Sequence, residues 1–179
     1  MEKIQIQNLV NILGKMKSLK RTGWVKRQVK NPESDAEHSY SLAMLALLLA
    51  PKNLDLLKCL KLALIHDMPE IFCGDFVPGE LPELEKSRLE QNAMQKIAYN
   101  LNKPELMALF SEYEQHKTPE AEFVWALDRL DNIFTARFYE NEQNISLVNE
   151  FTSGAKSRID SLSQKSLSKR LQKILEDLN

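Results

Sequence analysis

The chain has 179 residues, of which 43% are hydrophobic, with 24 Lys and Arg against 25 Asp and Glu. This length fits one domain around a single core, and the net charge of -1 excludes a broad attraction to a nucleic-acid backbone. Two cysteines without paired spacing exclude a disulfide framework and a zinc ribbon.

The sequence predicts neither export nor a membrane span. Residues 1–20 mix charges into an amphipathic pattern and lack the apolar centre and small-residue cleavage site of a secretory signal. The longest apolar run, residues 42–50, ends at Pro51, at about half the length that a membrane-spanning helix requires. We therefore expect a soluble, cytoplasmic protein whose partners include no membrane and no nucleic acid polymer.

Apolar residues recur at steps of three and four along most of the chain, glycine is scarce, and no sustained two-residue alternation occurs. This pattern predicts an all-α fold, a single compact helical bundle. The first helix is expected over residues 4–19, with a buried stripe of Leu9, Ile12, Leu13 and Met16. Ser34 and Glu37 form a capping-box pattern that predicts the start of the next helix, which ends at Pro51.

The third predicted helix begins near Leu54 and ends at His66 and Asp67, because Pro69 removes an intrahelical hydrogen bond. Residues 68–82 contain three prolines and two glycines, which indicates an irregular loop beside the His-Asp pair. Further helices are expected over 83–101, 104–114, 119–140 and 156–178, with Thr118 capping the third of these. We expect a main domain over 1–150 and a C-terminal helical extension over 151–179 that packs on it.

Two histidines and two aspartates are the candidate metal ligands: His38, His66, Asp67 and Asp128. His38 lies in the first turn of its predicted helix on the apolar face, and Asp128 is flanked by apolar residues on its own helix. Burying Asp67 and Asp128 without compensation would cost several kcal/mol each. A divalent cation would neutralise them, and so would pairing with Arg129 or Arg137; the pattern alone leaves both interpretations open.

Several short motifs follow one another along the chain. They are Arg21-Thr22-Gly23-Trp24-Val25, Pro32-Glu33-Ser34 followed by Glu37-His38-Ser39, His66-Asp67-Met68-Pro69-Glu70, Gly74-Asp75, and Thr118-Pro119-Glu120-Ala121 followed by Leu127-Asp128-Arg129-Leu130. In these motifs the chain resembles the HD-domain superfamily of metal-dependent phosphohydrolases. The resemblance covers about residues 4–141 and is specific to the branch of bacterial 5'-deoxynucleotidases and HD-domain-containing 2 proteins.

The resemblance implies a role for each of eight residues. One divalent ion (Mn, Co, Fe, Ni, Zn or Mg) would be bound by His38, His66, Asp67 and Asp128. Glu70 and Asp75 would be catalytic, one deprotonating or orienting water and the other handling the proton of the leaving group, with assignments that can be exchanged. Arg21 and Trp24 would contact the nucleotide, although two residues separate them here and the nucleotidase pattern has them adjacent. Core packing is the alternative role for Trp24.

The principal hypothesis is therefore a metal-dependent phosphomonoesterase that releases phosphate from (deoxy)nucleoside 5'-monophosphates by attack of a metal-activated water. The chain has three histidines, and only His116 lies outside these motifs, which favours one metal ion over two. The alternatives are a phosphatase or phosphodiesterase acting on another small phosphate compound, and a noncatalytic nucleotide-binding HD protein. Helices with more than one apolar face, including residues 83–101, favour a homodimer.

Overall fold

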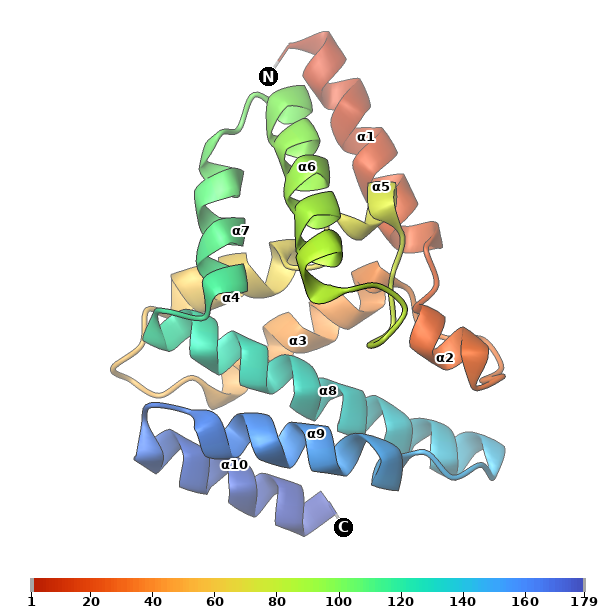
Figure 1. The fold of residues 1–179 in the computed structure, drawn as a ribbon, viewed down its shortest axis with the longest axis vertical. Helices are drawn as coiled ribbons and strands as arrows, with labels where there is room; N and C mark the ends of the chain where they lie inside the picture. The colour runs from red at the N-terminus through yellow and green to blue at the C-terminus, as the bar shows by residue number, and fades with distance from the viewer. Residues whose placement is uncertain (1, 179) are drawn as a thin grey trace. The chain divides into compact units, whose positions relative to one another are not determined.

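The computed structural model describes residues 2–178, and its regular structure within that range is helical. The only strand-like feature among these residues is a single antiparallel bridge between Lys20 and Ser34. The helices, shown in Figure 1, are α1 (Lys3–Ser18), α2 (Thr22–Lys26), α3 (Asp35–Leu49), α4 (Leu56–Ile65), α5 (Glu70–Cys73), α6 (Glu83–Leu101), α7 (Glu105–Gln115), α8 (Pro119–Gln143), α9 (Val148–Ser161) and α10 (Lys165–Leu178). The predicted all-α class is confirmed.

Two helix caps predicted from the sequence are present. The Glu37 carboxylate accepts hydrogen bonds from the backbone N–H and the hydroxyl of Ser34 at 2.6 and 2.8 Å, and the Glu37 N–H donates to the Ser34 hydroxyl at 3.3 Å. The Thr118 hydroxyl accepts from the Ala121 N–H at 3.3 Å at the start of α8, where Pro119 is the first helical residue. The first cap matters for function because it fixes the turn of α3 that carries His38.

Three details of the helix predictions are wrong. The irregular loop expected over residues 68–82 contains the short helix α5. The helix expected over residues 156–178 is interrupted between α9 and α10, where the N–H and hydroxyl of Ser163 both bond to the Glu122 carboxylate. These bonds give the chain a polar anchor at the turn between the two helices. Leu13, expected in the buried stripe of the first helix, is 49% exposed, whereas Ile12 and Met16 are buried.

The chain divides into two units, unit 1 (Met1–Tyr40 and Leu64–Ser111) and unit 2 (Ser41–Ala63 and Glu112–Asn179). In unit 1, α1, α5 and α6 pack against one another (Figure 1). Unit 1 contains one buried apolar cluster, to which α4 and α7 also contribute and which consists of Ile12, Met16, Ile65, Ile71, Met94, Ile97, Leu101 and Phe110. Because Ile65 and Ile71 lie on either side of His66, Asp67 and Glu70, this core holds the backbone of that segment in place.

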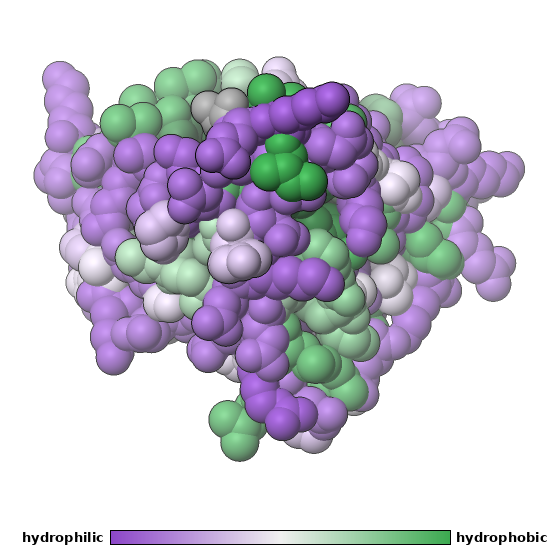
Figure 2. All heavy atoms as spheres, turned by 90° about the horizontal axis from the view of Figure 1, so that it is seen from above, coloured by the Kyte–Doolittle hydropathy of each residue, from purple (hydrophilic) through white to green (hydrophobic). Residues whose placement is uncertain are grey.

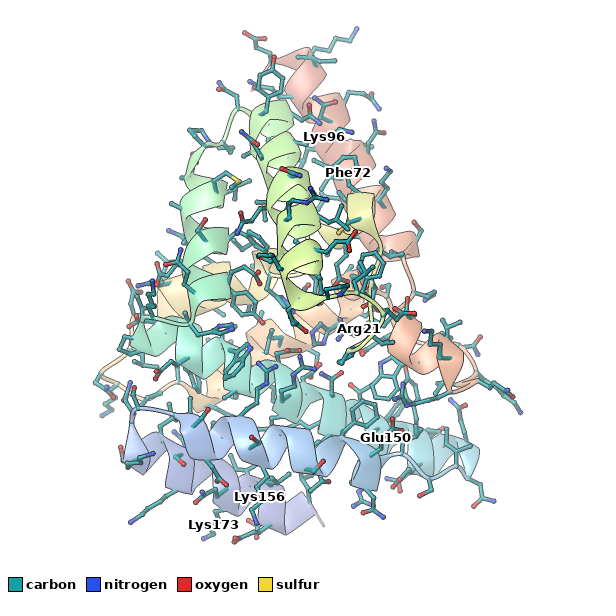
Figure 3. The ribbon with its side chains drawn as sticks, in the orientation of Figure 1. Arg21, Phe72, Lys96, Glu150, Lys156 and Lys173 are labelled. Atoms are coloured by element: carbon teal, nitrogen blue, oxygen red, sulfur yellow. The ribbon has the colours of Figure 1, made fainter. Side chains whose placement is uncertain are left out.

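The outer side of the short helix α5 is covered by two cations. Phe72 is partly exposed, and the ammonium groups of Lys15 on α1 and Lys96 on α6 lie 4.7 and 4.4 Å from the centre of its ring. Figure 3 labels Phe72 and Lys96 at this contact. Cation–π contacts of this kind stabilise an exposed aromatic ring by about 0.5–1 kcal/mol each, so α5 is held on its exposed side as well as on its core side.

Unit 2 is built around the long helix α8. Helix α9 packs along α8, and α10 packs along α9 (Figure 1). Asp128 lies in the middle of α8, among the buried residues Val124, Leu127 and Leu130. The predicted division of the chain at residue 150 stays a prediction.

Hydrophilic side chains dominate the face seen in Figure 2, with smaller hydrophobic patches between them. The exposed hydrophobic residues include Ile6, Val10 and Leu13, which recur at steps of four and three along α1 and so lie on one side of that helix. Within residues 2–178, each helix is too short or too polar to cross a bilayer.

Candidate metal centre and neighbouring carboxylates

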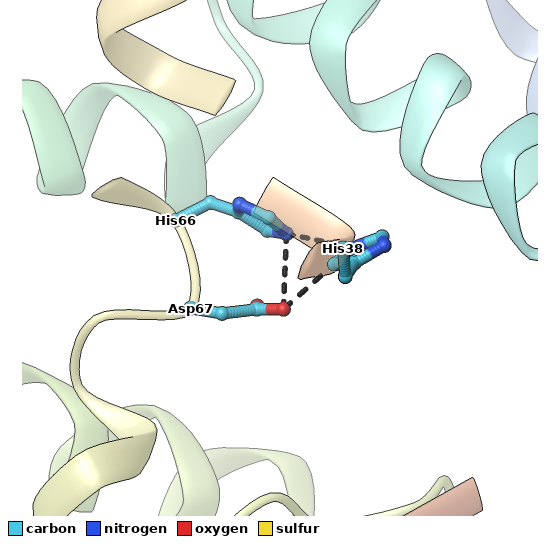
Figure 4. Close-up of side chains that lie close together, drawn as sticks. All are labelled: His38, His66 and Asp67. Carbon is cyan, nitrogen blue, oxygen red and sulfur yellow. Dashed lines mark hydrogen bonds and ion pairs between the residues drawn. The ribbon is translucent and has the colours of Figure 1, made fainter. Parts of the chain in front are cut away.

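Three of the predicted metal ligands meet in unit 1. His38 lies in the first turn of α3, and His66 and Asp67 directly follow the last residue of α4. The Nε2 atoms of the two histidines are 3.2 Å apart, and Oδ2 of Asp67 lies 3.1 Å from Nε2 of His66 and 3.7 Å from Nε2 of His38. Figure 4 shows the three donor atoms facing one another. Both imidazoles are buried, and the Asp67 side chain is 14% exposed.

These three residues fit a divalent ion. Ligand atoms placed about 2.0–2.2 Å from one ion in tetrahedral geometry are roughly 3.3–3.6 Å from each other, and the three separations observed here are 3.1, 3.2 and 3.7 Å. Two imidazole nitrogens and a carboxylate oxygen are donors that suit first-row transition metals. The donor set therefore has the chemistry and the spacing of a metal centre.

Asp67 is held in its ionised form. Burial favours the protonated acid, but His66, Arg21 and His38 outweigh it and hold the pKa of Asp67 well below its usual value. The Arg21 guanidinium donates to Oδ2 of Asp67 at 2.7 Å, the same oxygen that faces the histidines. An ionised carboxylate is the form that binds a cation without first releasing a proton.

Arg21 and Trp24, the predicted substrate residues, have different surroundings. Arg21 is 14% exposed in its side chain and contacts both Asp67 and Glu33. Trp24 is buried, with 2% of its surface exposed, and its indole N–H donates to the Glu33 carboxylate at 2.8 Å. In this arrangement Trp24 belongs to the core of unit 1, and its contact with a nucleotide stays a prediction.

A second cluster in unit 1 contains three carboxylates: Asp35, Glu70 and Asp75. Each offers an oxygen that lies within 4.8 Å of the others. Oδ2 of Asp75 accepts a hydrogen bond from the Thr22 N–H at 2.6 Å. Both oxygens of Asp35 and Oε2 of Glu70 are buried and have no hydrogen-bond partner. Buried polar atoms of this kind require a compensating proton, ion or water, so this cluster is poised to hold one.

Burial raises the pKa of all three carboxyl groups. Burial, followed by the charge of Asp67, raises the pKa of Asp35 to about 8 and raises that of Glu70 well above its usual value. The pKa of Asp75 is raised as well, by burial, although Arg21 and the Thr22 N–H act in the opposite direction. In the metal-free protein, protons are therefore retained at this cluster near neutral pH.

We expect Asp35→Asn to remove part of the pH dependence of stability in the metal-free protein. The pKa of Asp35 rises from 3.8 to about 8 on folding, so between these values the native protein holds a proton that the unfolded chain has lost. The free energy of unfolding then falls as pH increases through this window and levels off above it. Asparagine cannot ionise, so the variant should be the more stable protein at pH 9.

Urea unfolding of chelator-treated protein at pH 5, 7 and 9 measures this difference. The exposed residue Glu85 provides the matched control. The Glu85→Gln variant should follow the wild-type pH curve, and a parallel curve for Asp35→Asn would contradict the expectation.

Sequence reasoning missed Asp35. It is the first residue of α3, where an acidic residue is common because it favours the amino-terminal end of the helix dipole. Because this role is common at exposed helix starts, the sequence gives no sign that Asp35 is completely buried. The only available signal was its position three residues before His38, which is not specific enough to identify a site residue.

The fourth predicted ligand, Asp128, lies in unit 2. It is 7% exposed, its carboxylate is 3.6 Å from Nε of Arg129, and it accepts a 3.4 Å hydrogen bond from the side-chain amide of Asn132. The Arg129 pairing considered from the sequence is therefore present, whereas Arg137 pairs with Glu140. The remaining histidine, His116, stacks on Trp125 with ring centres 4.2 Å apart. Metal binding by Asp128 stays a prediction.

Comparisons with known proteins agree with this geometry. Residues 13–170 match the HD domain family. The 5'-deoxynucleotidase HDDC2 of Mus musculus is 39% identical over 139 residues, which cover 75% of this chain and 70% of the mouse protein. A crystal structure from Pyrococcus horikoshii superposes with a TM-score of 0.82 at 32% identity, covering 97% of each chain. A predicted metal-dependent phosphohydrolase from Magnetospirillum magnetotacticum superposes with a TM-score of 0.71 at 26% identity, covering 98% of this chain and 93% of the other.

The chain belongs to the HD-domain family of metal-dependent phosphohydrolases. The resemblance drawn from its motifs is confirmed, and so is the predicted HD-domain fold.

Proposed function

We propose that this protein is a 5'-deoxynucleotidase, a metal-dependent phosphohydrolase that releases phosphate from nucleoside 5'-monophosphates. The observation that carries the proposal is the convergence of His38, His66 and Asp67, with Glu70 three residues after Asp67. Relatives named 5'-deoxynucleotidase, from mouse to fission yeast, cover about three quarters of the chain at 35–39% identity, which supports the substrate class.

One divalent ion is proposed as the cofactor, bound by His38, His66, Asp67 and Asp128. When bound, such an ion supplies a Lewis acid that neutralises phosphate oxygens and makes water a stronger nucleophile at neutral pH. Mn, Co, Fe, Ni, Zn and Mg are all candidates, because geometry and availability select among metals more than affinity does. The donor atoms of His38, His66 and Asp67 lie close together before an ion binds, which reduces the cost of ordering them.

Glu70 and Asp75 are proposed to move the two protons of the reaction. Glu70 has a buried oxygen without a hydrogen-bond partner and a pKa raised by burial and by Asp67, which supports a protonated acid that donates to the leaving 5'-oxygen. Burial raises the pKa of Asp75, but Arg21 and the Thr22 N–H favour its ionised form, which supports a base that takes a proton from the attacking water. The exchanged assignment is the alternative.

Arg21 and Trp24 are proposed to act on the substrate side. Arg21, ion-paired with Asp67, brings positive charge beside the donor atoms, where a phosphate would need it. Trp24 would have to leave its buried position to stack on a base, and core packing is its alternative role.

We further propose that the protein works as a cytoplasmic homodimer. The support for association is the apolar stripe of Ile6, Val10 and Leu13 on α1, whose side chains are 49–59% exposed. Such a stripe gains stability when a second copy covers it.

The test removes metal with a chelator, restores single ions, and measures phosphate release from matched ribo- and deoxyribonucleoside 5'-monophosphates. We expect release from the deoxyribonucleotides with at least one transition-metal ion and none without metal. Release only from other small phosphate esters would favour the broader phosphatase or phosphodiesterase. Nucleotide binding without release under every ion would favour the noncatalytic HD protein.

A further inference from the structure

We infer that Glu33 is a positioning residue of the metal centre, acting through Arg21 on the Asp67 oxygen that faces the two histidines. This inference rests on the proposed function, because it assigns Asp67 as a metal ligand. It adds a residue that the family motifs mark only as the middle of a Pro-Glu-Ser sequence.

Hydrogen bonds hold both the main chain and the side chain of Glu33 in place. Its carbonyl oxygen accepts the Arg21 N–H at 3.1 Å, and the neighbouring Asp35 N–H donates to the Leu19 carbonyl at 3.1 Å. These bonds flank the antiparallel bridge between Lys20 and Ser34. The two chain segments, residues 19–21 and 33–35, are therefore tied together, and Glu33 cannot move away from Arg21 without breaking the pairing.

The Glu33 carboxylate joins two buried groups through one oxygen. Oε1 accepts the Trp24 indole N–H at 2.8 Å and lies 3.8 Å from Nε of Arg21. The side chains of Glu33 and Arg21 are 12% and 14% exposed, so solvent screens their attraction less than it would at the surface. Glu33 thus anchors the Nε side of the guanidinium.

The other end of the same guanidinium reaches the metal centre. Nη1 of Arg21 donates to Oδ2 of Asp67 at 2.7 Å, and this oxygen lies 3.1 Å from Nε2 of His66. An arginine side chain has several rotatable bonds, and holding it at both ends removes that freedom before a ligand arrives. The carboxylate then presents one defined oxygen to the ion, which is how residues behind a metal ligand raise affinity.

If the role of Glu33 is purely structural, a different effect of its substitution on metal affinity is expected. If Glu33 only satisfies the buried Trp24 N–H, a neutral acceptor in its place would serve equally well. Glu33→Gln keeps a side-chain oxygen for Trp24 and removes the charge that attracts Arg21. The substitution therefore separates a contribution to the metal centre from a role confined to Trp24, and the Arg21 variant below tests the route through Arg21.

The experiment measures metal affinity by isothermal titration calorimetry of chelator-treated protein with Mn²⁺ and with Co²⁺. We expect Glu33→Gln to weaken binding by about 10- to 100-fold, the usual effect of removing a partner behind a metal ligand. The melting temperature of the metal-free protein and its tryptophan emission should stay close to wild type. Glu105→Gln is the matched control, because Glu105 forms a 3.2 Å ion pair with Lys103 at an exposed position of unit 1.

Unchanged metal affinity in a folded Glu33→Gln protein overturns the inference. Arg21→Lys is the second variant, since lysine keeps the positive charge but cannot contact Glu33 and Asp67 with two ends of one planar group. It should also weaken metal binding, and retained affinity in both variants would leave Glu33 with the structural role. Wild-type protein that binds metal but releases no phosphate would refute the proposed function and leave this affinity comparison intact.

Discussion

Glu70→Gln is expected to lower kcat for phosphate release by about 10²- to 10⁴-fold, the usual contribution of a general acid or base. The side chain is 6% exposed, lies three residues after Asp67, and carries a buried oxygen without a hydrogen-bond partner. Glutamine has nearly the same shape but cannot give up or accept the reaction proton. Metal affinity should stay near wild type, because Glu70 is not among the residues facing the two histidines.

The leaving group tells which proton Glu70 handles. A 5'-nucleoside oxygen needs a proton as it departs, whereas 4-nitrophenolate leaves without one. If Glu70 is the acid, Glu70→Gln should lose much less activity on 4-nitrophenyl phosphate than on a nucleotide. Equal losses on both substrates would assign it as the base, with Asp75 as the acid.

Glu85→Gln changes an exposed carboxylate of unit 1 and should retain wild-type rates on both substrates. Wild-type kcat in Glu70→Gln on both substrates would remove Glu70 from the reaction altogether.

His66→Ala should abolish metal binding at concentrations that saturate the wild-type protein, and phosphate release should be lost with it. The change removes a donor that lies 3.2 Å from Nε2 of His38 and 3.1 Å from Oδ2 of Asp67. Losing a direct ligand should weaken affinity by more than the ~100-fold upper range for a residue behind a ligand.

The same substitution has a second effect through Asp67. His66 is the main group that counteracts burial and keeps the pKa of Asp67 low. Without it that pKa rises, so an incoming cation must displace a proton from a larger fraction of the molecules as pH falls. The pH dependence of metal affinity should accordingly differ between His66→Ala and the wild-type protein.

Metal content by elemental analysis and affinity by calorimetry at two pH values measure both effects. His116→Ala is the control, because this histidine stacks on Trp125 in unit 2 and no ligand role is proposed for it. It should keep its metal. A His66→Ala protein that binds the ion as tightly as wild type would contradict the assignment of this centre.

Local sequence signals predicted much of the fold and part of the site. The Ser34–Glu37 box places His38 in the first turn of α3, and Pro69 marks the point where the helix ends beside His66 and Asp67. These features depend on residues within one turn of each other, which is why a sequence pattern can reveal them. The convergence of His38 with His66 was inferred from family motifs, since no local rule brings together residues 28 positions apart.

The features that sequence missed depend on tertiary packing. Complete burial of Asp35, the Glu33 contact with Trp24, and the Ser163 anchor to Glu122 all join residues whose partners are set by the fold. An acidic residue at a helix start is usually solvated, so its identity alone does not indicate a buried cluster. Metal binding by Asp128 is inferred from the family motifs and stays a prediction.

The short helix α5 combines stability and chemistry within a single turn. Glu70, with its proposed proton, is followed directly by Ile71, which is packed in the core of unit 1. A change of bulk at Ile71 would therefore shift the Glu70 carboxylate and the core of unit 1 together.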